Sequence, residues 1–193
     1  LVVGAGPVGA SLACALDGSG LRVALVEASL PAQSAPGFDE RKLALAAASL
    51  EALDTLGVAA KLATPPEPIR AIHVSRVGDF GSVRLHAKDY GRDALGGVVL
   101  ARELGEALEA RLASVAGLTR LRPATVVAAR PHDDAMHVDI ERDGAVEPWR
   151  ARLVVAADGT RSRLRDAAGI GVATHDYGQH LFVFAAQADR AHD

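Results

Sequence analysis

The sequence is poor in the residues that build disulfides, metal centres and acyl-transfer sites. It has one cysteine, Cys14, in 193 residues, so it can form neither an internal disulfide nor a thiolate cluster. Its seven histidines lack ligand spacing, and neither an HExxH motif nor a Gly-x-Ser-x-Gly elbow occurs. We therefore expect no metal site and assign no catalytic residue. We expect a reducing cytoplasm, with Cys14 a small core residue.

Long apolar segments and basic runs are missing as well. No stretch approaches 18 apolar residues without a charge, so no transmembrane helix is predicted. The formal net charge is −3, and no Lys/Arg cluster favours nucleic acid as a partner. A hydrophobic content of 49% with 23% charged residues is typical of a globular protein.

What the sequence does contain is a glycine-rich turn at its start. Leu1–Val3 is typical of a buried strand, and a helix is predicted over Pro7–Leu16. Between them, Gly4 permits a tight turn, Gly6 lets a pyrophosphate approach the backbone, and Gly9 lets the helix pack closely on the strand. The N–H groups at the helix start favour an anion. The candidate phosphate-binding residues are Gly4, Ala5, Gly6, Pro7, Val8 and Gly9.

A carboxylate ends the next predicted strand, Leu21–Glu27. Glu27 at this position can accept hydrogen bonds from a ribose diol, as in dinucleotide-binding units. Its charge repels a ribose 2′-phosphate, which favours FAD or NAD over NADP at this first site. The alternative is an ordinary βαβ turn that binds no ligand.

Helical and strand patterns alternate along the rest of the chain. Apolar residues at three- and four-residue spacings predict one helix from Asp39 or Glu40 to Leu56, and another over Arg102–Val115. A period of two predicts a hairpin of Ile69–Val77 and Ser82–His86. Further strands are predicted at 98–100, 118–121, 125–129, 136–141, 149–156 and 181–188, and a short helix at 161–168.

This order predicts an α/β fold in which a Rossmann-like βαβ nucleotide-binding domain is interleaved with a β-rich domain. We place the nucleotide-binding domain at 1–68 and 99–172, and parts of the second domain at 69–98 and 173–193. Leu1 already lies inside a predicted strand, and the last strand has no closing element. We therefore expect the chain to be a piece of a longer protein.

Asp158 ends another predicted strand and precedes the start of a short helix. A carboxylate at this position can accept a hydrogen bond from a ribose hydroxyl, or order a water that bridges phosphates. The alternative is that Asp158 caps the helix.

Arg41 and Arg102 each stand in the first turn of a predicted helix. A positive charge there opposes the helix dipole at a cost of about 0.3–1 kcal/mol. A nearby anion, such as the phosphates of a dinucleotide, would explain the placement. Solvated arginines paired with Asp39, Glu40 or Glu103 would explain it equally well.

Three segments carry a family resemblance: the Gly4–Gly9 turn with Glu27, the stretch 36–46, and Ala157–Ser162. Together they resemble the aromatic-ring flavoprotein monooxygenases, the para-hydroxybenzoate hydroxylase-like group. Three further segments resemble its ubiquinone-biosynthesis branch, the 2-octaprenyl-6-methoxyphenol hydroxylases in particular. These are His73-Val74-Ser75, Asp89-Tyr90 and Ala94–Val99.

The resemblance implies an FAD-binding domain of the glutathione-reductase type, interleaved with part of a truncated substrate domain. It also implies hydroxylation of a phenolic, polyprenylated ubiquinone precursor through a flavin hydroperoxide, with O2 and NAD(P)H as co-substrates. It implies that Gly4, Gly6 and Gly9 hold the pyrophosphate and that Glu27 holds the adenosine ribose. It also implies that Arg41 and Arg102 contact FAD and that the backbone of Val126 lies near the adenine. Asp158 would bind both FAD and the nicotinamide nucleotide.

One family segment has no match here, the later Gly-Asp segment that binds the flavin ribityl chain. We therefore expect the substrate pocket to lie beyond residue 193 and this fragment alone to be inactive. A polyprenyl tail implies contact with a membrane surface or association with other ubiquinone-biosynthesis proteins. The alternatives are another FAD-dependent oxidoreductase of this architecture, such as a prenyl reductase or epoxidase, and a non-catalytic nucleotide-binding module.

Overall fold

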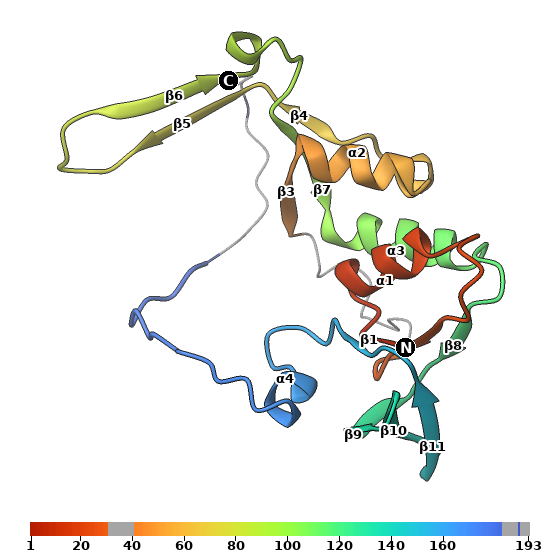
Figure 1. The fold of residues 1–193 in the computed structure, drawn as a ribbon. Coiled ribbons are helices and arrows are strands. Elements are labelled where there is room, and N and C mark those ends of the chain that lie inside the picture. The colour runs from red at the N-terminus through yellow and green to blue at the C-terminus, as the bar shows by residue number, and fades with distance from the viewer. Residues whose placement is uncertain (31–40, 183–188, 190–193) are drawn as a thin grey trace. The chain divides into compact units, whose positions relative to one another are not determined.

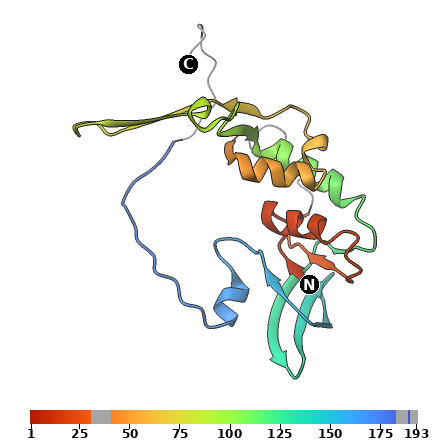
Figure 2. The same cartoon turned by 45° about the horizontal axis from the view of Figure 1, so that its top comes forward.

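A computed structural model describes residues 1–30, 41–182 and 189. The chain divides into two compact units, and each is described by itself (Figures 1 and 2). The first unit is Leu1–Phe38 with Leu108–Leu181, and the second is Asp39–Ala107 with Phe182–Asp193. The division by function, with parts of a second domain at 69–98 and 173–193, stays a prediction.

A four-stranded parallel sheet forms the centre of the first unit. Its order is β12-β1-β2-β8, and β1 is paired in parallel with both β2 and β12. Because the strands run in the same direction, their carboxyl ends meet at one edge, where α/β proteins bind ligands. The strands are β1 (Val2–Val3), β2 (Ala24–Val26), β8 (Thr119–Leu121) and β12 (Val155–Ala156).

Helix α1 (Pro7–Ala15) packs against β1 and β2, which confirms the predicted βαβ start. Its buried residues are all small: Gly9, Ala10, Ala13 and Cys14. Small side chains allow the helix to approach the strands closely. Burial also raises the pKa of the Cys14 thiol, as expected for a core cysteine.

An antiparallel meander covers the parallel sheet with apolar side chains. Its strands are β9 (Thr125–His132), β10 (Ala135–Arg142) and β11 (Ala145–Ala151), in the order β11-β10-β9. The short helix α4 (Arg163–Ala167) packs against β9. The buried residues that join the two sheets are Val3, Val26, Leu121, Ala124, Val126, Val138 and Ile140.

The second unit is built on antiparallel strands. A three-stranded sheet has the order β3-β7-β4, and β5 and β6 form a separate hairpin. Helix α3 (Ala101–Leu112) begins in this unit and ends in the first. The other elements are β3 (Lys42–Ala46), α2 (Ala47–Thr55), the 3-10 helix η1 (Ala59–Lys61), β4 (Glu67–Ile69), β5 (Ala71–Ser75), β6 (Ser82–His86), the 3-10 helix η2 (Ala87–Tyr90) and β7 (Gly96–Leu100).

The helix predicted from Asp39 or Glu40 to Leu56 is wrong in its first half. Lys42–Ala46 is strand β3, paired antiparallel with β7, and only α2 is helical. The segment is rich in Ala and Leu and satisfies a helical period. However, Leu43 and Leu45 also alternate, and backbone pairing with Gly96–Leu100 decides between the two conformations. Asp39, Glu40 and most of the predicted strand 181–188 lie outside the described residues.

Candidate functional site

A hollow of about 470 Å³ lies at the carboxyl edge of the parallel sheet, within the first unit. This volume is in the range of small-molecule sites. Residues that follow β1, β2 and β12 form its rim, together with the segment that enters β9. Its lining consists of Val3, Gly4, Gly6, Val26, Glu27, Ala28, Ala124, Thr125, Val126, Ala157, Asp158, Gly159, Arg161, Arg163 and Leu164.

The three fingerprint glycines stand in three different surroundings. Gly4 has φ +101°, and a Cβ there would lie 2.3 Å from the carbonyl oxygen of Ala157. A Cβ on Gly9 would lie 1.9 Å from the carbonyl oxygen of Gly4. A Cβ on Gly6 would meet no atom of the described residues within 4 Å. Gly4 and Gly9 are thus required by the fold, whereas Gly6 leaves open space beside the hollow.

The backbone at the start of α1 has no side-chain cap. Gly6 is the N-cap and offers no side-chain oxygen, Pro7 follows it, and the first turn contains no acidic residue. Gly6, Pro7 and Val8 are all exposed. Helix-start N–H groups carry a partial positive charge, so this arrangement suits a bound anion.

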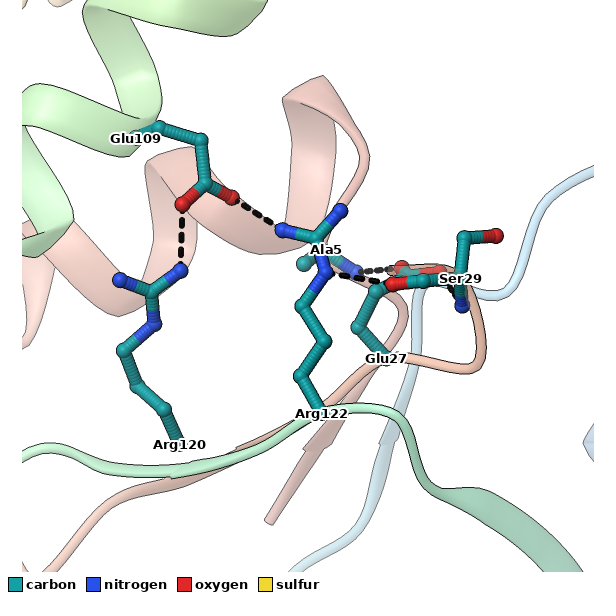
Figure 3. A network of polar contacts seen from close by, with 6 residues as sticks. All are labelled: Ala5, Glu27, Ser29, Glu109, Arg120 and Arg122. Atoms are coloured by element: carbon teal, nitrogen blue, oxygen red, sulfur yellow. Dashed lines mark hydrogen bonds and ion pairs between the residues drawn. The ribbon is translucent and has the colours of Figure 1, made fainter. Parts of the chain in front are cut away.

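Glu27 lies directly after β2 and faces the glycine turn (Figure 3). Its Oε2 accepts a hydrogen bond from the Ala5 amide at 2.7 Å, and its Oε1 accepts one from the Ser29 amide at 2.8 Å. Each carboxylate oxygen has more than one acceptor position. Glu27 can therefore keep both bonds and still accept from the two hydroxyls of a ribose.

The two carboxylate oxygens of Asp158 have different surroundings, and each fits one of the two predicted roles. Its Oδ2 accepts a hydrogen bond from the Leu164 amide of α4 at 3.4 Å. Its Oδ1 is buried and has no hydrogen-bond partner in the described part of the chain. The N-cap of α4 is instead Ser162, whose Oγ accepts from the Arg165 amide at 3.0 Å. A buried oxygen without a partner needs a donor, and a ligand hydroxyl or a water would supply one.

Both carboxyl groups are held ionised by their surroundings. Burial by itself raises the pKa of Glu27. The hydrogen bonds from the Ser29 and Ala5 amides and the charge of Arg122 together lower it by more, so the pKa lies below its ordinary value. Burial likewise raises the pKa of Asp158. Hydrogen bonding by Ser162 and the Leu164 amide outweighs it, and this pKa too is lowered. Two fixed acceptors thus face the hollow at neutral pH.

Arg41 and Arg102 belong to the second unit, and their predicted contacts with FAD stay predictions. Arg41 precedes strand β3, so its placement in a helical first turn is wrong. Arg102 does stand in the first turn of α3. There it pairs with Glu106 at 3.1 Å and with Glu103 at 3.9 Å, and the Glu103 pair was one of the two alternatives.

The hollow is lined by one further predicted residue and by several that the sequence analysis did not single out. The predicted one is Val126, which lies in β9 and is 7% exposed. Thr125 beside it was missed, as were Arg161 and Arg163 next to Asp158. Two arginines within five residues of a strand-end aspartate are a usable signal for an anionic ligand. Thr125 carries no such signal, because its position depends on the tertiary fold.

No group of three or more His, Cys, Asp and Glu side chains is placed to hold a metal ion within residues 1–30, 41–182 and 189. In the same part of the chain, no helix is both long and apolar enough to cross a membrane.

The residues present fit a dinucleotide cofactor. Open space beside Gly6 would admit a diphosphate, Glu27 provides acceptors for a ribose, and the buried Oδ1 of Asp158 lacks a donor. All three features lie around one hollow. An ordinary βαβ turn that binds no ligand does not explain why these three features occur together.

Comparison with known proteins agrees with this geometry. The ubiquinone hydroxylase UbiL of Rhodospirillum rubrum is 40% identical over an alignment of 195 residues that covers 100% of this chain and 44% of that protein. The 3-demethoxyubiquinol 3-hydroxylase of Escherichia coli K12 is 32% identical over an alignment of 201 residues that covers 97% of this chain and 48% of that protein. The chain thus spans less than half the length of these relatives.

A solved structure supports the same fold. CabE, an aromatic hydroxylase from angucycline biosynthesis, matches with a TM-score of 0.68 and 30% identity over 87% of this chain and 32% of CabE. The FAD binding domain model matches residues 1–191. The glycine turn, the two carboxylates at the hollow and these similarities lead to one conclusion: the chain belongs to the FAD-binding domain family.

Proposed function

We propose that this chain is the FAD-binding part of a flavin-dependent monooxygenase that hydroxylates an aromatic ubiquinone precursor. The observation that carries the proposal is the hollow at the sheet edge, where open space beside Gly6 adjoins the acceptors Glu27 and Asp158. The names of the relatives supply the reaction, because both UbiL and the Escherichia coli enzyme are ubiquinone-pathway hydroxylases.

Each binding residue has a defined part in this proposal. The backbone of Gly4–Gly9, including Ala5, Pro7 and Val8, holds the diphosphate, and Glu27 holds the adenosine ribose. Val126 lies near the adenine, and Asp158 serves both the flavin nucleotide and the nicotinamide nucleotide. Arg41 and Arg102 are two further residues that we propose contact FAD.

Bound FAD would supply the electron transfer and oxygen chemistry, with NAD(P)H as the transient donor and O2 as the oxidant. The protein's task is to orient the cofactor and exclude water from the reacting ring. We propose a phenolic substrate with a polyprenyl tail. Such a substrate favours peripheral contact with a membrane, or association with other ubiquinone-biosynthesis proteins.

The second domain is proposed at 69–98 and 173–193, and the β5–β6 hairpin supports this. Cross-strand pairs place Ile72 opposite Leu85 and Val74 opposite Val83, so the apolar residues share one face. Ile72, Val74 and Val83 are exposed. An isolated two-stranded hairpin is only marginally stable, so we propose that this face packs in the full-length protein.

The test uses the full-length protein. We expect it to purify with bound flavin, to oxidise NAD(P)H faster when a prenylated phenol is present, and to add one oxygen atom to the ring, as followed by mass spectrometry. A flavin-containing protein that reduces or epoxidises the prenyl chain would overturn the hydroxylase proposal. A colourless protein that binds a nucleotide without turnover would favour the non-catalytic module.

A further inference from the structure

Arg122 bridges two parts of the first unit that are far apart in the sequence. It follows strand β8, and its side chain lies between the turn after β2 and helix α3 (Figure 3). Its Nε donates a hydrogen bond to the carbonyl oxygen of Ser29. Its Nη1 donates to Oε1 of Glu109 at 2.6 Å. The guanidinium therefore fixes the Ser29 backbone to a residue of the helix.

The turn that Arg122 holds is the one that carries Glu27. The Ser29 amide donates to Oε1 of Glu27 at 2.8 Å, so the position of Ser29 sets one side of this carboxylate. The backbone around Arg122 holds Glu27 as well. The Glu27 amide donates to the Leu121 carbonyl at 2.9 Å, and the Ala124 amide donates to the Glu27 carbonyl at 2.8 Å.

The charges of this network are balanced and partly shielded from solvent. Arg120 and Arg122 both bind the Glu109 carboxylate, one to each oxygen. Arg122 is the more enclosed, with 17% of its side chain exposed against 33% for Arg120. Within the described residues, Arg122 also donates to the backbone of the Glu27–Ser29 turn, through the Ser29 carbonyl oxygen. Glu109 thus pairs with both arginines, and Arg122 extends the network to the Glu27–Ser29 turn.

We propose that Arg122 is a positioning residue for the cofactor: it holds the Glu27–Ser29 turn against Glu109, so that the Glu27 carboxylate faces the adenosine ribose. This inference rests on the proposed function, because it takes the ligand at Glu27 to be the adenosine half of FAD. Arg122 itself need not touch the cofactor. It acts through Ser29, which presents its amide to the carboxylate.

The experiment uses the full-length protein and measures dissociation constants for FAD, for ADP-ribose as an adenosine-bearing probe, and for FMN, which lacks adenosine. Arg122→Gln removes the bridge, and Arg122→Lys keeps the charge without the forked geometry. Arg120→Gln is the matched control, since Arg120 shares the partner Glu109. Glu27→Gln and the double variant with Arg122→Gln complete a thermodynamic cycle.

For Arg122→Gln we expect roughly tenfold weaker FAD and ADP-ribose binding, the size of one hydrogen bond to a charged group, with FMN affinity unchanged. Arg122→Lys is expected to rescue only part of the loss, and Arg120→Gln to change the three constants less than twofold. The double variant is expected to bind FAD no more weakly than Glu27→Gln.

The outcomes separate the two proposals. If Glu27→Gln weakens FAD but Arg122→Gln does not, or if the two losses add in full, the positioning role is overturned and the proposed function stands. An equal loss of FMN binding would make Arg122 a general structural residue and also overturn the role. If Glu27→Gln leaves both adenosine ligands unaffected, the ribose assignment fails, and the inference fails with it.

Discussion

Two turns at the edge of the parallel sheet follow neighbouring strands yet are built differently. The turn after β1, Gly4–Gly9, uses glycine and backbone, and its helix has no side-chain cap. The turn after β12, Ala157–Leu164, uses polar side chains, with Ser162 as the helix cap and Asp158 bonded to the Leu164 amide. They touch where Gly4 meets the Ala157 carbonyl.

The difference between the turns indicates what each can bind. Open space and backbone N–H groups suit a diphosphate, which needs close approach more than a specific side chain. A fixed carboxylate suits hydroxyl groups of a ribose or an ordered water. The first turn therefore depends on the absence of side chains, and the second on the presence of one.

The sharpest contrast lies within the first turn, between Gly9 and Gly6. Gly9→Ala places a Cβ 1.9 Å from the Gly4 carbonyl oxygen, so we expect a loss of stability of about 3 kcal/mol or more. The added Cβ of Gly6→Ala meets no atom within 4 Å in the part of the chain that the structure describes, at an ordinary φ of −64°, and we expect a change within about 0.5 kcal/mol. Chemical denaturation of the full-length variants measures both. Equal losses at the two positions would contradict the packing role of Gly9.

A larger side chain at Gly6 separates binding from folding. Gly6→Val fills the space proposed for the diphosphate, so we expect FAD affinity to fall by about a hundredfold, equivalent to ~3 kcal/mol. The melting temperature of the cofactor-free protein should stay close to that of Gly6→Ala. Flavin titration and thermal unfolding measure the two effects. Stoichiometric flavin in Gly6→Val would show that the diphosphate lies elsewhere.

Substitution of Asp158 tests the second turn. Asp158→Asn keeps the size of the side chain but removes the charge and one acceptor, so we expect flavin reduction by NAD(P)H to slow roughly tenfold, about 1–2 kcal/mol. The stability of the cofactor-free protein should fall only slightly, because the Asn carbonyl oxygen can still accept from the Leu164 amide and only the stabilisation of the charged form is lost. Stopped-flow reduction and thermal unfolding distinguish these quantities. An unchanged reduction rate would leave Asp158 as a structural residue.

The smallest expected effect is on pH dependence. The pKa of Glu27 is lowered in the folded protein from an ordinary value of 4.5, so its ionised form favours folding. That contribution is complete above the unfolded pKa and is lost as the pH falls through the folded pKa. The difference in melting temperature between wild type and Glu27→Gln should therefore shrink below about pH 4.5. A difference that is constant from pH 6 to 3 would contradict the shift.

Local patterns were enough wherever the chain makes its structure from neighbours in sequence. The strand, glycine turn and α1 were predicted from the first residues, since the backbone there requires glycine at positions 4 and 9. The β5–β6 hairpin was predicted from its alternation. Lys42–Ala46 was predicted wrongly, because pairing with a strand some fifty residues later overrides helix propensity. The Arg122 bridge was not predicted either.

By itself, the sequence determined the nucleotide-binding start, the acceptors Glu27 and Asp158, and the FAD-binding family, because these depend on backbone conformation and residue chemistry at fixed spacing. Tertiary structure alone decided that Gly4 touches Ala157, that one oxygen of Asp158 has no partner among the described residues, and that Arg122 reaches Ser29. The reason is physical: parallel pairing brings the ends of four separate strands to one edge, and no local spacing records which side chains then meet.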